Sequence, residues 1–139
     1  MKKIIFILFI VILGSKDIKA QVPDTLAYLQ SIVANKAQYV GQPFSVLQNS
    51  LQIQIKFFYP FAGLTYNKTK ETSTSYAFYF PANAEETYLT YPHLEIYWQS
   101  NVDADQSRAL RSQYRSVGWN PQIANYYSSY IITDIKVRE

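Results

Sequence analysis

The 139-residue chain contains no cysteine, a single histidine and only four glycines. The absence of cysteine excludes disulfide bonds, thiolate catalysis and lipid attachment through a processed cysteine. A catalytic zinc site needs about three convergent protein ligands, and His93 has no second histidine or cysteine to join it. Neither a glycine-rich phosphate loop nor a Gly-x-Ser-x-Gly nucleophile motif is present. We therefore expect no metal and no cofactor.

The chain has only one long apolar run, close to its start. A short basic segment precedes ten consecutive apolar residues, 4–13, and a polar stretch follows them. This order is typical of a secretory signal peptide, and a membrane-spanning helix needs roughly 20 apolar residues. We expect residues 1–20 to be a cleavable signal peptide and residues 21–139 to form a single domain. The mature protein is then secreted or periplasmic, without a transmembrane anchor.

The net positive charge of the chain comes from this predicted signal peptide. The whole sequence has 13 Lys and Arg against 10 Asp and Glu, a formal charge of +3. Four of the basic and one of the acidic residues lie within residues 1–20, so nine of each sign remain in the mature domain. A neutral domain lacks the basic surplus that displaces counterions from phosphates. We therefore expect no nucleic-acid partner.

Apolar periodicity in the mature domain predicts helices first and strands afterwards. A helix over residues 24–37 follows a possible N-cap at Asp24, and a second helix begins near Pro43. From residue 52 the apolar residues alternate, which is typical of half-buried strands. The predicted strands cover residues 52–59, 75–80, 87–98 and 130–137. A polar loop is expected over residues 65–74, and a third helix from Asp103 or Asp105 to about residue 117.

The order of these elements indicates an α+β fold. Short links between consecutive strands favour a mostly antiparallel four-stranded sheet. The N-terminal helix pair is expected to pack on this sheet, with an additional helix before the last strand. We expect the faces of the third strand to differ, with Leu94, Ile96 and Trp98 pointing inward.

The two N-terminal helices are joined by a Gly-x-Pro turn within the sequence YVGQPF, residues 39–44. With a helix pair followed by a sheet, residues 24–98 resemble the small exported domains that include β-lactamase-inhibitor proteins and outer-membrane assembly lipoproteins. The resemblance implies an inhibitor or an envelope-assembly factor as one alternative function. The helix predicted near residues 105–117 departs from that pattern, and no functional residue is carried over from it.

A possible acid–base pair lies on the third predicted strand. Alternation places His93, Glu95 and Tyr97 on one face, opposite the apolar residues. Histidine titrates near neutral pH, and a carboxylate two residues away allows acid–base chemistry. The same spacing also fits a plain polar strand surface. A small exported hydrolase using His93 with a nearby carboxylate such as Glu95 is therefore an alternative, whereas our first hypothesis is non-enzymatic.

Aromatic side chains predict a contact surface on the outer face of the sheet. The predicted alternation places Phe58, Tyr79 and Tyr97 on that face. Exposed aromatic clusters mark sites that contact proteins or stack on sugar rings. A register error of one residue would exchange the two faces of a strand.

Arginines on the third predicted helix add a second binding feature. Arg108, Arg111 and Arg115 recur at i, i+3 and i+7 and so form one stripe. Guanidinium groups bind carboxylates and sulfates through paired hydrogen bonds, although such a stripe is also common on solvated helix faces. Together these features predict an exported, non-enzymatic binding domain whose partner is a protein or a glycan.

Overall fold

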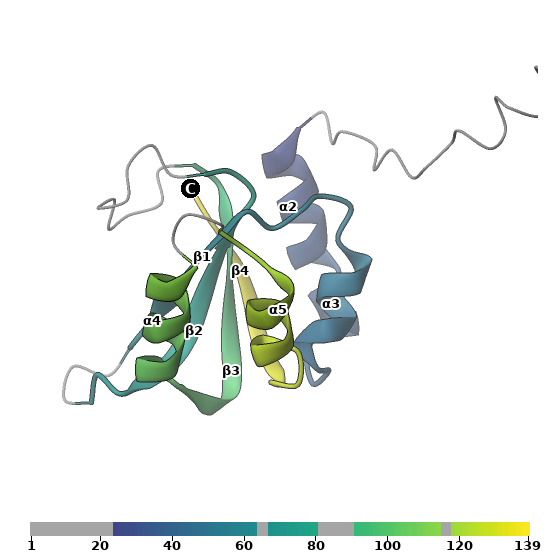
Figure 1. Ribbon diagram of the computed structural model, residues 1–139. Helices are drawn as coiled ribbons and strands as arrows, with labels where there is room; N and C mark the ends of the chain where they lie inside the picture. The colour runs from purple at the N-terminus through teal and green to yellow at the C-terminus, as the bar shows by residue number, and fades with distance from the viewer. Residues whose placement is uncertain (1–23, 64–66, 81–90, 115–117) are drawn as a thin grey trace, which may run out of the picture.

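The computed structural model describes residues 24–63, 67–80, 91–114 and 118–139 (Figure 1). The predicted signal peptide, residues 1–20, lies outside these ranges. Within them, no helix combines the length and the apolar character that crossing a membrane requires.

Four strands form one antiparallel sheet in the order β1-β2-β3-β4. The strands are β1 (Phe57–Phe61), β2 (Lys70–Ala77), β3 (His93–Asp103) and β4 (Ile132–Arg138). Each strand pairs with its neighbour in sequence, even β3 and β4, which residues 104–131 separate. The predicted α+β class with a mostly antiparallel four-stranded sheet is therefore confirmed.

Four α-helices accompany the sheet in the described ranges. They are α2 (Thr25–Ala34), α3 (Phe44–Ser50), α4 (Ala104–Gln113) and α5 (Pro121–Tyr127), and a 3-10 turn, η1 (Lys36–Gln38), follows α2. Asp24 caps α2 by accepting a hydrogen bond from Ala27 N at 3.1 Å. Asp103, not Asp105, caps α4, because its carboxylate accepts from two backbone amides in the first turn. The predicted helix pair and third helix are present.

The sequence prediction lacked α5, which stands between α4 and β4. The side chain of Asn120 accepts hydrogen bonds from Gln122 N and Ile123 N, at 2.9 and 3.1 Å, and Pro121 occupies the first helical position. Asn followed by Pro is a recognised helix start. The helix is short and buries only Ile123 and Tyr127, so its apolar period is too brief to stand out.

An aromatic core joins the helices to one face of the sheet. Tyr127 of α5 is fully buried and stacks on Trp98 of β3, with ring centroids 5.8 Å apart. Phe44 of α3 stacks on Tyr76 of β2 at 4.7 Å, and Phe58 of β1 meets Tyr127 edge-on at 5.7 Å. The helices α2, α3 and α5 lie on this core side of the sheet, while α4 lies beside its β1 edge (Figure 1).

The predicted register of the first strand was wrong. β1 begins at Phe57, and Phe58 is only 3% exposed within the aromatic core. Phe57 and Tyr59 therefore point to the outer face instead. The local sequence does not decide between Phe57 and Phe58 because both are equally apolar, so packing against Tyr127 and Trp119 sets the register.

The second half of the segment predicted as a polar loop is strand. β2 begins at Lys70, so residues 70–74 pair with β3 although they are polar. As a result Glu71, Ser73 and Thr74 are buried, at 0 to 1% exposure. The predicted strand end was also too late, since β2 stops at Ala77. For the third strand, residues 87–90 of the prediction lie outside the described ranges, and β3 continues to Asp103.

β4 departs from simple alternation. Ile132 and Ile135 are both fully buried although they are three residues apart, and Thr133 between them is exposed. The β3–β4 register shifts between Tyr97 and Trp98, which gives β4 one extra residue. Such a bulge turns both isoleucines inward.

Candidate functional site

The outer face of the sheet carries an ordered grid of side chains. Alternate residues of neighbouring strands pair directly, so they share this face. Two rows cross all four strands: Tyr59, Ser75, Glu95 and Lys136 form one, and Phe61, Ser73, Tyr97 and Asp134 form the other. The intervening residues, such as Tyr76 and Ile96, face the aromatic core. The predicted outward orientation of Glu95 and Tyr97 agrees with this arrangement.

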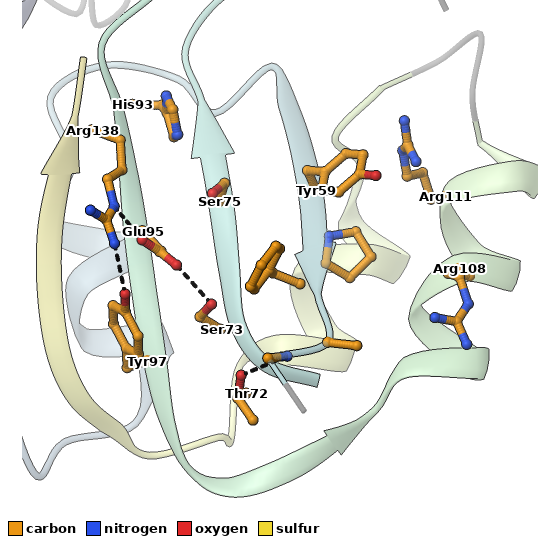
Figure 2. Close-up of a pocket in the computed structure, with 14 residues that line it drawn as sticks. Tyr59, Thr72, Ser73, Ser75, His93, Glu95, Tyr97, Arg108, Arg111 and Arg138 are labelled. Atoms are coloured by element: carbon orange, nitrogen blue, oxygen red, sulfur yellow. Dashed lines mark hydrogen bonds and ion pairs between the residues drawn. The ribbon is translucent and has the colours of Figure 1, made fainter. Parts of the chain in front are cut away.

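A pocket of about 920 Å³ opens on this outer face (Figure 2). Five of the residues singled out from the sequence line it: His93, Glu95, Tyr97, Arg108 and Arg111. The sheet supplies the first three and α4 supplies the two arginines. The pocket therefore combines the predicted acid–base pair with two members of the predicted arginine stripe. Arg115, the third member, lies outside the described residues.

Arg138 also lines the pocket and was not identified from the sequence. Its Nε donates to Glu95 Oε2 at 2.5 Å, and its Nη2 donates to the hydroxyl of Tyr97 at 3.0 Å. The other carboxylate oxygen of Glu95 accepts from Ser73 Oγ at 2.9 Å (Figure 2). Arg138 follows a long connection after β3, and only the pairing of β3 with β4 brings it opposite His93.

These contacts set the charge of Glu95. Burial acts to raise the pKa of Glu95, but the hydrogen bonds from Arg138 and Ser73 outweigh burial and hold its pKa below the ordinary value of 4.5. Glu95 is therefore ionised at neutral pH. The hydrogen bonds of Arg138 to Glu95 and to Tyr97 raise the pKa of Arg138. The pair is an oriented arginine–carboxylate contact with both charges retained.

His93 lies beside this network but is not hydrogen-bonded to Glu95. Desolvation lowers the pKa of His93 below its ordinary value of 6.5, so the ring is neutral at pH 7. Its Nδ1 lies 3.0 Å from the carbonyl oxygen of Tyr91, which makes Nδ1 the protonated nitrogen. Nε2 is then an acceptor. Glu95 is instead engaged by Arg138 and Ser73.

The two arginines of α4 are held by different contacts. The guanidinium of Arg111 lies over the ring of Tyr59 at 4.4 Å and over the ring of Phe57 at 5.4 Å. Arg108 pairs with Asp105 at 2.5 Å and donates two hydrogen bonds to the carbonyl oxygen of Lys68, both at 3.1 Å. Cation–π and carbonyl contacts thus fix where each guanidinium stands at the rim of the pocket.

The predicted aromatic surface does not form as expected. Phe58 belongs to the core, as described above. Tyr79 lies outside the pocket, where its hydroxyl hydrogen-bonds the backbone of Tyr91 and its ring meets the Tyr91 ring edge-on at 5.1 Å. Tyr59 and Phe61 of β1 stand in the pocket instead, together with Tyr97. A predicted β1 register with Phe58 inward would have placed Tyr59 and Phe61 on the outer face.

A second polar cluster, missed by the sequence reading, lies in the core rather than in the pocket. Glu71 is fully buried and accepts hydrogen bonds from the hydroxyl of Thr74 and from that of Tyr127, the latter at 3.1 and 3.2 Å. Trp98 Nε1 donates to Thr74 Oγ1 at 2.8 Å. Burial raises the pKa of Glu71 to about 7. We refer to these four residues as the Glu71 cluster.

The described ranges contain no group of three or more His, Cys, Asp or Glu placed to hold a metal ion. Comparisons of the chain with protein-family models, with curated proteins and with solved structures found no match. The chemistry of the outer-face pocket is therefore the basis on which a function is assigned.

Proposed function

We propose that the pocket on the outer sheet face binds an anionic ligand without chemically changing it. The observation that carries this proposal is the convergence of three arginines, Arg108, Arg111 and Arg138, on one pocket. Glu95 is the only carboxylate among the described residues that line the pocket, Asp105 outside the lining pairs with Arg108, and neutral His93 adds no charge. An excess of guanidinium groups attracts carboxylate or sulfate and holds it through paired hydrogen bonds.

The placement of the arginines supports capture of a ligand between them. Arg108 and Arg111 stand on the α4 side of the pocket and Arg138 on the β4 side, with β2 between them (Figure 2). Arg138 is oriented by Glu95 and Tyr97, and Arg111 by two aromatic rings. Side chains that are already oriented lose less conformational entropy when a ligand binds. On the strength of the predicted signal peptide, we place this activity in the periplasm or outside the cell.

The proposal predicts that Arg111→Glu weakens binding of an anionic probe by about tenfold or more. The change removes a charge-assisted contact and adds a repelling carboxylate, and tenfold corresponds to about 1.4 kcal/mol. Suitable probes are trigalacturonate and N-acetyl-triglutamate amide, which carry equal charge. Binding is measured by titration of backbone amide NMR signals at constant ionic strength.

The matched control is Lys70→Glu, which changes the net charge equally at an exposed residue outside the pocket. It is expected to retain the wild-type affinity. If neither probe binds the wild-type protein, or if the two variants weaken binding equally, the proposal fails.

A second function is favoured by one observation, the presence of His93 and Glu95 in the same pocket. The acceptor nitrogen Nε2 of neutral His93 is suited to act as a general base in a hydrolase. Against this, Glu95 is committed to Arg138 and does not orient the imidazole. The hydrogen bonds among the lining residues therefore suit binding better than catalysis.

The hydrolase alternative predicts that His93→Ala reduces turnover by about 100-fold or more, the usual contribution of a general base. The binding proposal instead predicts no turnover in the wild-type protein. Incubating the protein with fluorogenic ester, phosphate and glycoside substrates distinguishes the two. Hydrolysis that persists unchanged in His93→Ala would show a contaminating enzyme and remove the alternative.

A further inference from the structure

The pocket has the shape of a groove that follows β2. Into it β2 presents the small side chains of Ser73 and Ser75, whereas β1 presents Tyr59 and Phe61 on one side and β3 presents the row from His93 to Tyr97 on the other. Small residues between two walls of large ones form a floor (Figure 2). Adjacent strands lie about 4.8 Å apart, so the β1 and β3 backbones are separated by about 10 Å. His93 and Tyr97 are four residues apart, which gives the groove a length of about 13 Å.

These dimensions exclude a helix and disfavour a peptide strand. An α-helix with its side chains is about 10–12 Å wide, which leaves no room for the side chains of the two walls. An extended peptide normally binds by pairing its backbone with a free strand edge. The backbone of β2 is already paired with β1 and β3, so the amides of a peptide in this groove would lack backbone partners. Unpaired amides removed from water cost free energy.

The groove instead matches the chemistry of a sugar chain. Phe61, 53% exposed, offers an open ring face at the β1 side. The floor and the opposite wall carry the hydroxyls of Ser75 and Tyr97 and the acceptor nitrogen of His93, while the buried Ser73 hydroxyl is held by Glu95. A sugar ring has an apolar face suited to an aromatic side chain and hydroxyl groups around its edge. The arginines at both sides favour in addition a ligand that carries negative charge.

We infer that the ligand of this pocket is an acidic oligosaccharide, bearing carboxylate or sulfate groups, that lies along β2 with one ring against Phe61. This inference rests on the proposed function and specifies the class of ligand. The acidic groups pair with Arg138 on one side and with the arginines of α4 on the other. The hydroxyl groups of the sugar are recognised by Ser75 and by Tyr97.

The test compares three probes by isothermal titration: trigalacturonate, its uncharged methyl ester, and N-acetyl-triglutamate amide. We expect the wild-type protein to bind trigalacturonate most tightly, about tenfold better than either other probe. Phe61→Ala is expected to weaken trigalacturonate binding about five- to tenfold and to leave the affinity for the triglutamate peptide unchanged. Phe80→Ala, which removes another exposed phenylalanine outside the pocket, is the matched control and is expected to have no effect.

The outcomes separate the inference from the function on which it rests. If the triglutamate peptide binds as well as trigalacturonate, or Phe61→Ala has no effect, the saccharide inference is overturned while anionic binding stands. If the uncharged ester binds as tightly as the acid, the requirement for an acidic sugar is overturned. If neither anion binds, both the inference and the proposed function fail.

Discussion

Replacing Glu71 by glutamine is expected to stabilise the domain by about 3 kcal/mol at pH 8 and by little below pH 5. Glu71 is fully buried, and burial raises its pKa from 4.5 in an exposed setting to about 7. Glutamine has nearly the same shape and carries no charge at any pH. It therefore avoids the cost of holding an ionised carboxylate in the core, while its amide still hydrogen-bonds Thr74 and Tyr127.

The sign of this pH dependence follows from proton binding. A carboxyl group with a raised pKa binds its proton more tightly in the folded than in the unfolded protein. Its contribution to stability is complete below pH 4.5, the unfolded pKa, and is lost as the pH rises through about 7. The wild-type domain is thus expected to lose stability relative to Glu71→Gln between pH 5 and pH 8. The lowered pKa of His93 acts in the opposite direction but equally in both proteins.

Urea unfolding of both proteins at pH 5 and pH 8 measures this effect. Glu95→Gln serves as the matched control of opposite sign, because the pKa of Glu95 is lowered and its carboxylate stabilises the fold above the ordinary pKa. That variant is expected to be destabilised at pH 8 and less so at lower pH. A Glu71→Gln protein that is equally stabilised at both pH values, or destabilised at pH 8, would contradict the role assigned to burial.

The second large effect is expected at Tyr127, where substitution by alanine should cost about 4 kcal/mol of stability. The side chain is fully buried, stacks on Trp98 and Trp119, and meets Phe58 edge-on. Its removal leaves a cavity at the centre of the aromatic core and takes a hydrogen-bond donor from Glu71. A loss of this size is a large part of the roughly 5–15 kcal/mol that stabilises an ordinary domain.

Tyr127→Phe separates the contribution of the ring to stability from that of the hydroxyl group. It retains the packing but leaves Glu71 without the hydrogen bond from Tyr127, so its cost is expected to be about 1–2 kcal/mol and greater at pH 8, where Glu71 is ionised. Tyr91→Ala, at a side chain that is 63% exposed, is the control and should cost about 1 kcal/mol or less. Thermal and urea unfolding measure all three. Equal losses for Tyr127→Ala and Tyr91→Ala would show that the aromatic core does not hold the fold together.

The features predicted correctly from the sequence depend on neighbouring residues. Asp24 and Asp103 begin helices because each side chain bonds amides two or three residues ahead. Alternation in β3 correctly assigned Leu94 to the core and Glu95 to the outer face. Each of these signals lies within a few residues, so no knowledge of the rest of the chain is needed.

The errors fall where local signals were absent or ambiguous. Adjacent phenylalanines at 57 and 58 have no alternation, so only packing against Tyr127 decides which one is buried. The start of β2 has a polar sequence and was therefore predicted as a loop. Its Glu71 is nevertheless buried, because it has hydrogen-bond partners up to 56 residues away in the chain. A carboxyl group in a core is tolerated only when such donors surround it, and no spacing along the sequence reveals them.

The residues of the candidate site fall into the same two groups, those that local sequence patterns predict and those that only the fold brings together. The sequence alone determined that His93, Glu95 and Tyr97 share a face and that Arg108 and Arg111 share a helix stripe. The tertiary structure decided that these two groups line one pocket, that Arg138 pairs with Glu95, and that Tyr59 and Phe61 replace Phe58 and Tyr79 as its aromatic residues. The physical reason is that alternation along a strand is local, whereas the register between strands is set by the long-range packing of the core.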